Sequence, residues 1–170
     1  SGLCFTADGH NLVVADFGND RVQVFQEDGT IVRTFGTKGE NDGQFRGPWD
    51  VCCMPDGSIA VLDQGNYRVV LLGIARLATL PSFAFEHFRS FGSKGDGPGQ
   101  FLHPDAIVAG GRGEVIVADS ERKDIQVFSA EGELLQIIGS TDYRGMSIRE
   151  DDSHLDSCLH WHGLGPVGVA

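Results

Sequence analysis

A ten-residue segment recurs in this chain with its glycines and its Gln-Phe pair at the same positions. Its copies are Gly36–Phe45 and Gly92–Phe101, and each phenylalanine is followed by x-x-Pro. Behind each copy come a short apolar run, a turn and a second apolar run that ends in aspartate, at Asp63 and Asp119; a similar run ends at Asp16. A unit of roughly 45 residues with several short strands is typical of a propeller or a related array. The repeat therefore predicts an all-β fold.

Each unit is predicted to hold four strands. The first follows the proline, at Val51–Met54 in the second unit and Ala106–Ala109 in the third, and a glycine turn leads to the second, Val/Ile-rich strand. The nearly continuous apolar character of that second strand predicts that it is covered on both faces. The third strand, Val22–Phe25 or Ile125–Phe128, alternates apolar and polar residues as a half-buried strand does. Four antiparallel strands per unit make a propeller blade.

The repeat spacing also predicts how the chain is divided. The expected ranges are 1–36 for blade 1, 37–92 for blade 2 with a hairpin insertion near 73–87, 93–140 for blade 3, 141–165 for an irregular insertion, and 166–170 for the start of a fourth repeat. Closed propellers need about four to eight blades. We therefore expect a segment of a larger propeller, with its remaining blades in the parent chain.

A polar motif follows the second strand of each unit. Two units share an aspartate, an asparagine and an arginine at the same spacing, and the third keeps only the aspartate: Asp16, Asn19 and Arg21; Asp63, Asn66 and Arg68; Asp119, with Arg122 and Asp124 at the other two positions. Aspartate and asparagine suit tight turns because their side chains bond nearby backbone N–H groups. The arginine can pair with a carboxylate across the turn. We expect a structural corner here and no catalytic constellation.

These features together resemble the NHL-repeat family. The matching elements are the Gly-x-x-Gly…Gly-Gln-Phe-x-x-Pro segment, the Ala-Asp or Leu-Asp strand end, and the Asn-x-Arg-Val third strand. The resemblance implies a β-propeller, commonly of six blades. It further implies one of three settings: tripartite-motif ubiquitin ligases, in which the propeller binds protein or RNA, peptidyl-α-hydroxyglycine lyases, or bacterial sensor kinases.

The lyase chemistry is not supported at the positions where the family implies it. Such lyases carry zinc-binding histidines just after the proline, and the corresponding residues here are Trp49, Asp105 and Val167. A catalytic zinc typically needs three protein ligands. The remaining metal candidates lie near the end of the chain: His154, Cys158, His160 and His162. Their spacing matches no defined zinc motif, so we expect no metal and no cofactor.

Composition narrows the partners further. Thirteen basic residues face twenty-four acidic ones, for a net charge of −11, which disfavours RNA because nucleic-acid affinity rests on Lys and Arg. No apolar run reaches the length of about 18 residues that a transmembrane helix requires, so we expect no membrane segment. Cys4, Cys52 and Cys53 form no Cys-x-x-Cys pair, and reduced core thiols in a cytoplasmic protein are the expected reading.

Recognition is expected from side chains that vary between units: Arg46, Trp49, Phe17 and Tyr67. Variable loop residues on a rigid scaffold are where a propeller usually binds its partner. For Trp49 and Phe17, packing in the blade core is an equally good account. The sequence predicts a non-catalytic scaffold for protein–protein interaction, such as the partner-recognition part of a tripartite-motif-type ubiquitin ligase. The alternatives are a propeller enzyme of the peptidyl-hydroxyglycine lyase type and an RNA-binding NHL domain.

Overall fold

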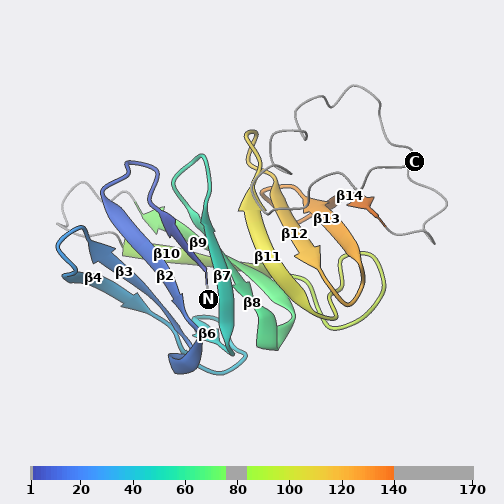
Figure 1. The fold of residues 1–170 in the computed structure, drawn as a ribbon, viewed down its shortest axis with the longest axis horizontal. Helices are drawn as coiled ribbons and strands as arrows, with labels where there is room; N and C mark the ends of the chain where they lie inside the picture. Colours follow the sequence, from blue (N-terminus) through green and yellow to red (C-terminus); the bar gives the residue numbers. More distant parts are fainter. Residues whose placement is uncertain (1, 76–83, 140–170) are drawn as a thin grey trace, which may run out of the picture.

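The computed structural model describes residues 2–75 and 84–139 of the chain. These residues form three four-stranded antiparallel sheets, each joined by hairpins in chain order, and a short two-stranded parallel pair (Figure 1). The all-β prediction with four strands per unit is confirmed. We call the three sheets blades 1, 2 and 3.

Blade 1 consists of β1 (Leu3–Phe5), β2 (Asn11–Asp16), β3 (Arg21–Gln26) and β4 (Ile31–Phe35). Blade 2 consists of β7 (Pro48–Cys53), β8 (Ile59–Asp63), β9 (Arg68–Ala75) and β10 (Ala84–Phe91). Blade 3 consists of β11 (Pro104–Ala109), β12 (Val115–Asp119), β13 (Asp124–Phe128) and β14 (Leu134–Ile138). The short parallel pair is β5 (Thr37–Lys38) with β6 (Gln44–Phe45).

The first strands of blades 2 and 3 begin earlier than the sequence suggested. Both β7 and β11 start at the proline itself, and in each the pairing register shifts between that proline and the second residue after it, Asp50 or Ala106. A bulge of this kind bends the strand at its start. The prolines fit because the first residue of a strand does not have to donate a ladder hydrogen bond.

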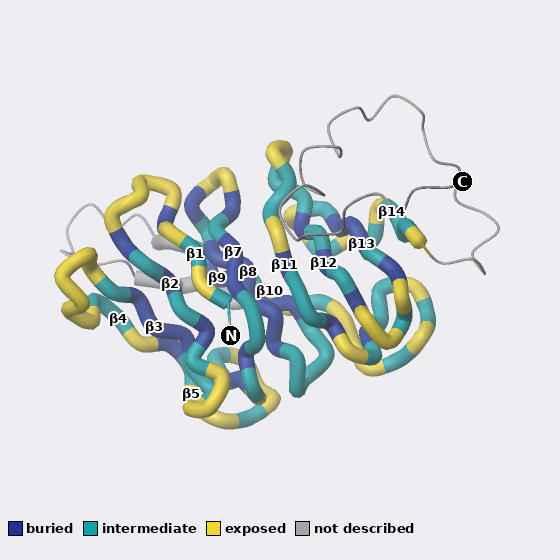
Figure 2. Tube along the Cα trace, viewed as in Figure 1, coloured by how far each residue is buried: buried dark blue, intermediate teal, exposed yellow. Residues whose placement is uncertain are grey.

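The three blades pack face to face through two apolar cores. One core joins blades 1 and 2 and includes Val13, Val22, Val61 and Leu72, all fully buried. The other joins blades 2 and 3 through residues such as Leu62 and Val115. Figure 2 shows the result, with buried segments concentrated along the strands and exposed ones at the turns.

Coverage of the second strand differs between the blades. All five residues of β8 are buried, as the sequence predicted, whereas β2 and β12 alternate buried and half-buried residues. The prediction of two covered faces is therefore wrong for β2 and β12. In the described part of the chain, only blade 2 lies between two other blades, so only β8 has both faces packed against a neighbouring core.

The corner after each second strand has the same backbone conformation in all three blades. Asp20, Tyr67 and Lys123 occupy the same repeat position, and their φ angles of 52°, 55° and 60° are left-handed. In blades 1 and 2 they end short 3-10 turns, Phe17–Asn19 and Gln64–Asn66. The corner is thus set by the repeat even though its residues differ.

Several expectations fall outside the described residues. The tip of the hairpin insertion, residues 76–83, and the whole of 140–170 with His154, Cys158, His160 and His162 belong there. The two strands that flank the tip, β9 and β10, pair along their length, with a register irregularity between Phe85 and His87. The domain boundaries remain predictions. None of the described helical segments has the length or hydropathy of a membrane span.

The segments that join the blades, which we call connectors (36–47 and 92–103), each bury a phenylalanine between two blades. Phe45 lies in the core between blades 1 and 2 and Phe101 in the core between blades 2 and 3; both are 0% exposed. Each ring sits directly over a glycine, Gly36 or Gly92, where any side chain would clash with it. This explains why glycine and phenylalanine recur together in the repeat.

We predict that Phe101→Ala lowers the free energy of unfolding by about 4 kcal/mol, because it removes a fully buried ring and leaves a cavity between two blades. Chemical denaturation followed by circular dichroism measures the change. The control is Phe5→Ala, whose ring is 58% exposed and whose loss is expected to cost less than about 0.5 kcal/mol. Equal effects of the two substitutions would contradict this account of the core.

The described cysteines are free and lie close to one another, Cys4 on β1 and Cys52 and Cys53 on β7. Burial raises the pKa of the Cys4 thiol to about 12, with the neighbouring Cys53 and Asp50 adding to the effect. Burial also raises the pKa of Cys52 and, to a smaller extent, that of Cys53. The raised pKa values keep these thiols protonated at neutral pH, as is usual for packed core thiols.

A second prediction concerns their reactivity. At pH 8 a thiol of pKa 12 is thiolate in only about one molecule in ten thousand. Alkylation by iodoacetamide is therefore expected to be slow at Cys4 and Cys52 and faster at Cys53, whose pKa is raised less. Peptide mass spectrometry resolves the three sites, and the denatured chain provides the fully reactive reference. Rapid labelling of Cys52 in the folded chain would be inconsistent with the packing described here.

Candidate interaction surface

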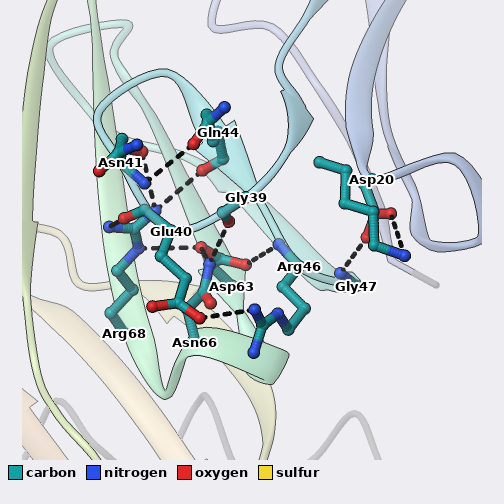
Figure 3. A network of polar contacts seen from close by, with 11 residues as sticks. Asp20, Gly39, Glu40, Asn41, Gln44, Arg46, Gly47, Asp63, Asn66 and Arg68 are labelled. Atoms are coloured by element: carbon teal, nitrogen blue, oxygen red, sulfur yellow. Dashed lines mark hydrogen bonds and ion pairs between the residues drawn. The ribbon is translucent and has the colours of Figure 1, made fainter.

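The corner of blade 2 is organised around the buried carboxylate of Asp63 (Figure 3). This carboxylate accepts hydrogen bonds from the Arg46 backbone N–H at 2.8 Å, the Asn66 side-chain amide at 2.7 Å and Arg68 Nε at 2.9 Å. The first of these donors belongs to the connector and the other two to the corner. Asp63 therefore fastens the connector to the blade that follows it.

Arg68 extends this attachment along the connector. Its guanidinium donates to the carbonyls of Glu40 at 2.7 Å, Asn41 at 3.3 Å and Gln44 at 2.8 Å, and Asn66 donates to the carbonyl of Gly39 (Figure 3). Backbone carbonyls of the connector gain side-chain hydrogen-bond partners in this way. The corner motif thus holds the connector in one conformation.

The aspartates at this repeat position have pKa values shifted in opposite directions in blades 1 and 2. Burial raises the pKa of Asp63, against the lowering effect of Arg46, Asn66 and Arg68. The hydrogen bond from Arg21 holds the pKa of Asp16 below its usual value, and Asn19 adds to this effect. Asp16 is partly exposed and Asp63 is fully buried. One repeat position therefore gives a surface ion pair in blade 1 and a buried one in blade 2.

Blade 3 reaches a similar attachment with other residues. Asp119 accepts hydrogen bonds from the backbone N–H groups of Leu102 and His103 in the connector and from those of Glu121 and Arg122 in the corner. Gln126 takes over the tethering role, since its amide donates to the carbonyl of Gln100 at 2.8 Å and its oxygen accepts from Gly99. Sequence reasoning missed Gln126, because it lies in a strand and outside the corner motif.

The corner residues that depart from the motif in blade 3 pair with each other. Arg122 and Asp124 form a buried ion pair at 2.7 Å, with side chains 4% and 1% exposed. Relative to blades 1 and 2, blade 3 has arginine at the asparagine position and aspartate at the arginine position. The structure thus shows an internal ion pair at this corner.

Three of the four predicted recognition residues lie together at the junction of blades 1 and 2. The rings of Phe17 and Trp49 pack at nearly a right angle with their centres 5.5 Å apart. The Phe17 ring also lies against Gly47, where a side chain would clash with it. Arg46 lies next to Gly47 in the connector and pairs with Glu40 at 2.5 Å. Phe17 is 44% exposed and the Arg46 side chain 52%, so we call these three residues the junction patch.

Tyr67 does not join the junction patch. It lies at the junction of blades 2 and 3, where the ammonium group of Lys94 sits 5.0 Å from the centre of its ring. The position that corresponds to Phe17 in blade 2 is Gln64, whose side chain donates to the carbonyl of Pro104. At the repeat position of Phe17, the second junction therefore has a polar side chain in place of an aromatic one.

The innermost strands β1, β7 and β11 line a groove of about 560 Å³ that includes Trp49, Asp50 and Asp105. The Asp50 carboxylate already has hydrogen-bond partners: it accepts from the backbone N–H groups of Val51 and of Ile107 in the next blade. Asp105 pairs with His103 at 2.7 Å. Within the described ranges, no three His, Cys, Asp or Glu side chains come close enough together to hold a metal ion.

Comparison with solved structures identifies the fold. The chain is similar to virginiamycin B lyase from Staphylococcus aureus (TM-score 0.57, 16% identity, 79% of this chain and 39% of that one). It is also similar to the WD40 repeats of RRP9 (TM-score 0.56, 14% identity, 80% and 37%) and to hydrazine synthase of Kuenenia stuttgartiensis (TM-score 0.61, 18% identity, 84% and 36%). No family model matches the sequence, and no curated protein matches it either.

These similarities, together with the three stacked four-stranded sheets, define the chain as β-propeller blades. The fold prediction is confirmed at this level. The chain spans 36–39% of the length of the three structures named. At such low identity the likeness concerns the fold alone, because one fold carries many unrelated functions.

A third prediction compares the aspartates of two corners. We expect Asp63→Asn to lower the free energy of unfolding by about 3 kcal/mol, because it leaves the nearly buried Arg68 without its counter-charge. Asp16→Asn, at the same repeat position but in a partly exposed pair, is expected to cost less than about 1 kcal/mol. Urea denaturation measures both variants. A larger loss for Asp16→Asn would refute the assigned role of Asp63.

Proposed function

We propose that this chain is a non-catalytic propeller scaffold that binds a protein partner through the junction patch. The observation that carries the proposal is the contact of Phe17 with Trp49 beside Arg46, on a connector fixed by Asp63 and Arg68. Aromatic and arginine side chains are the usual anchors of protein interfaces when they cluster on a rigid support.

Rigidity matters because ordering flexible side chains opposes binding. Two hydrogen bonds fix the backbone of the patch: the carbonyl of Arg46 accepts from the Gly65 N–H, and the Gly47 N–H donates to the carboxylate of Asp20. A patch that is already ordered in the free protein loses less conformational entropy on association. The junction of blades 2 and 3 lacks this aromatic pair, which favours the first junction as the binding site.

The finer assignment rests on the sequence resemblance. The NHL-like repeat pattern supports a partner-recognition role of the kind found in tripartite-motif ubiquitin ligases. The net charge of −11 argues against an RNA-binding role of the same family. For the lyase type, none of the described groups after the connector prolines is a histidine, and Asp50 is already hydrogen-bonded to two backbone amides.

The proposal predicts that partner binding depends on the junction patch. Cross-linking in cells followed by mass spectrometry identifies candidate partners, and affinity for a purified partner is then measured. We expect Trp49→Ala and Arg46→Glu each to weaken binding about tenfold or more. Phe5→Ala, an exposed aromatic outside the patch, serves as the control and is expected to leave the affinity unchanged.

Two other results would replace the proposal. RNA affinity that falls steeply with salt would indicate a nucleic-acid interface. Metal-dependent turnover that is lost on substitution of His160 or His162 would indicate an enzyme. Binding of the partner that is unaffected by both patch variants would place the interface elsewhere.

A further inference from the structure

The groove along β1, β7 and β11 carries negative charge. Strand β7 contacts both of the other strands. The volume of the groove, about 560 Å³, lies within the range of about 300–1,000 Å³ that is usual for binding sites. Its charged groups are the carboxylates of Asp50 and Asp105, and the described residues that line it include no lysine or arginine. The groove therefore suits a positively charged ligand.

The Asp50 carboxylate is fixed in position, yet no lysine or arginine among the described residues pairs with it. One of its oxygens accepts a hydrogen bond from the Val51 N–H at 2.9 Å and the other from the Ile107 N–H at 3.0 Å. It also lies against Gly2, where a side chain would occupy the space of the carboxylate. A carboxylate has about four lone-pair sites, so both oxygens can accept a further hydrogen bond.

Asp105 adds a second carboxylate from the neighbouring strand β11. Its Oδ1 lies 2.7 Å from Nδ1 of His103, and its Oδ2 accepts a hydrogen bond from the Ser120 N–H at 3.2 Å. The Asp105 side chain is 32% exposed, so it is also open to solvent. Two carboxylates on adjacent strands attract a cation more strongly than one, because their fields add in a groove with apolar walls.

Trp49 gives the groove an aromatic wall and links it to the junction patch. The Trp49 ring packs against Phe17 in that patch, and the same residue lines the groove. Tryptophan is the best aromatic partner for a cation, because the face of its ring carries partial negative charge. The patch and the groove therefore form one continuous surface, on which an aromatic ring lies beside an acidic group.

We propose that this groove binds the arginine or lysine side chain of a protein partner, an inference that rests on the proposed function of the junction patch. Leu3 and Val108, which are 61% and 41% exposed, also line the groove and can pack against the aliphatic part of such a side chain. The net charge of −11 favours the approach of a basic partner surface. A nucleic acid does not offer the cation that the two carboxylates require.

A short arginine peptide tests the groove before any partner is known. The probe is acetyl-Gly-Arg-Gly-amide, and the matched control contains citrulline, which has the shape of arginine without its charge. The Trp161→Phe chain leaves Trp49 as the only tryptophan, so that its fluorescence reports binding in the groove. We expect saturable binding of the arginine peptide at up to about 10 mM. The citrulline peptide is expected to bind about tenfold more weakly or worse.

Two lysine variants that change the net charge equally locate the site. Val108→Lys places a cation in the groove and is expected to weaken binding of the arginine peptide about tenfold or more. Ile31→Lys lies on the outer strand β4, at a residue that is 54% exposed, and is expected to leave binding unchanged because salt screens its charge. Circular dichroism checks that both variants are folded. Once a partner is purified, weaker binding to Val108→Lys alone would support the inference.

Three outcomes would overturn the inference. The first is equal binding of the arginine and citrulline peptides, or no binding of either; if Arg46→Glu still weakens the protein partner, the proposed function stands without this inference. The second is an equal effect of the two lysine variants, which would place the peptide elsewhere. The third is a dimer of the chain that Val108→Lys dissociates, which would make a second copy the occupant.

Discussion

Each connector places a phenylalanine ring between two blades, and the arrangement of the blades depends on that burial. Phe45 and Phe101 are the residues at which connector and two sheets meet in one apolar core. Their burial also requires glycine at positions 36 and 92, since a side chain there would occupy the space of the ring. The burial of the ring and the glycine turn beside it are therefore one packing arrangement, which is repeated at both described junctions.

Polar contacts around this packing arrangement fix each connector, but the residues that make them differ between blades 2 and 3. Blade 2 uses Asp63 and Arg68, whereas blade 3 uses Asp119 and Gln126. In both, a buried aspartate receives backbone N–H groups of the connector, and a side chain further along donates to a connector carbonyl. Because different side chains satisfy the same backbone groups, the surface residues between them are free to differ, and Trp49 in blade 2 corresponds to Asp105 in blade 3. This freedom is consistent with recognition at the junction patch.

Much of the fold could be predicted from the sequence, because the repeat places glycine, Gln-Phe and the strand-ending aspartate at regular offsets. The offsets identify strands and turns, but they do not show which connector residue enters the core. The role of Phe101 follows only from the packing of two sheets, and the tether from Gln126 follows from a contact across 26 residues. The clustering of Phe17 with Trp49, and the separation of Tyr67 from them, likewise depend on which blade faces which corner. Local sequence carries no signal for these contacts.

The central claim is that stability resides in the junctions between blades, so the blade with two junctions is the most stable. Native-state hydrogen exchange resolved to single amides tests this most directly. The account predicts the slowest exchange in β8, whose residues are buried on both faces, and faster exchange in β2 and β12, which pack against one neighbour within the described residues. Uniform exchange across the three blades, or slowest exchange in β12, would contradict it.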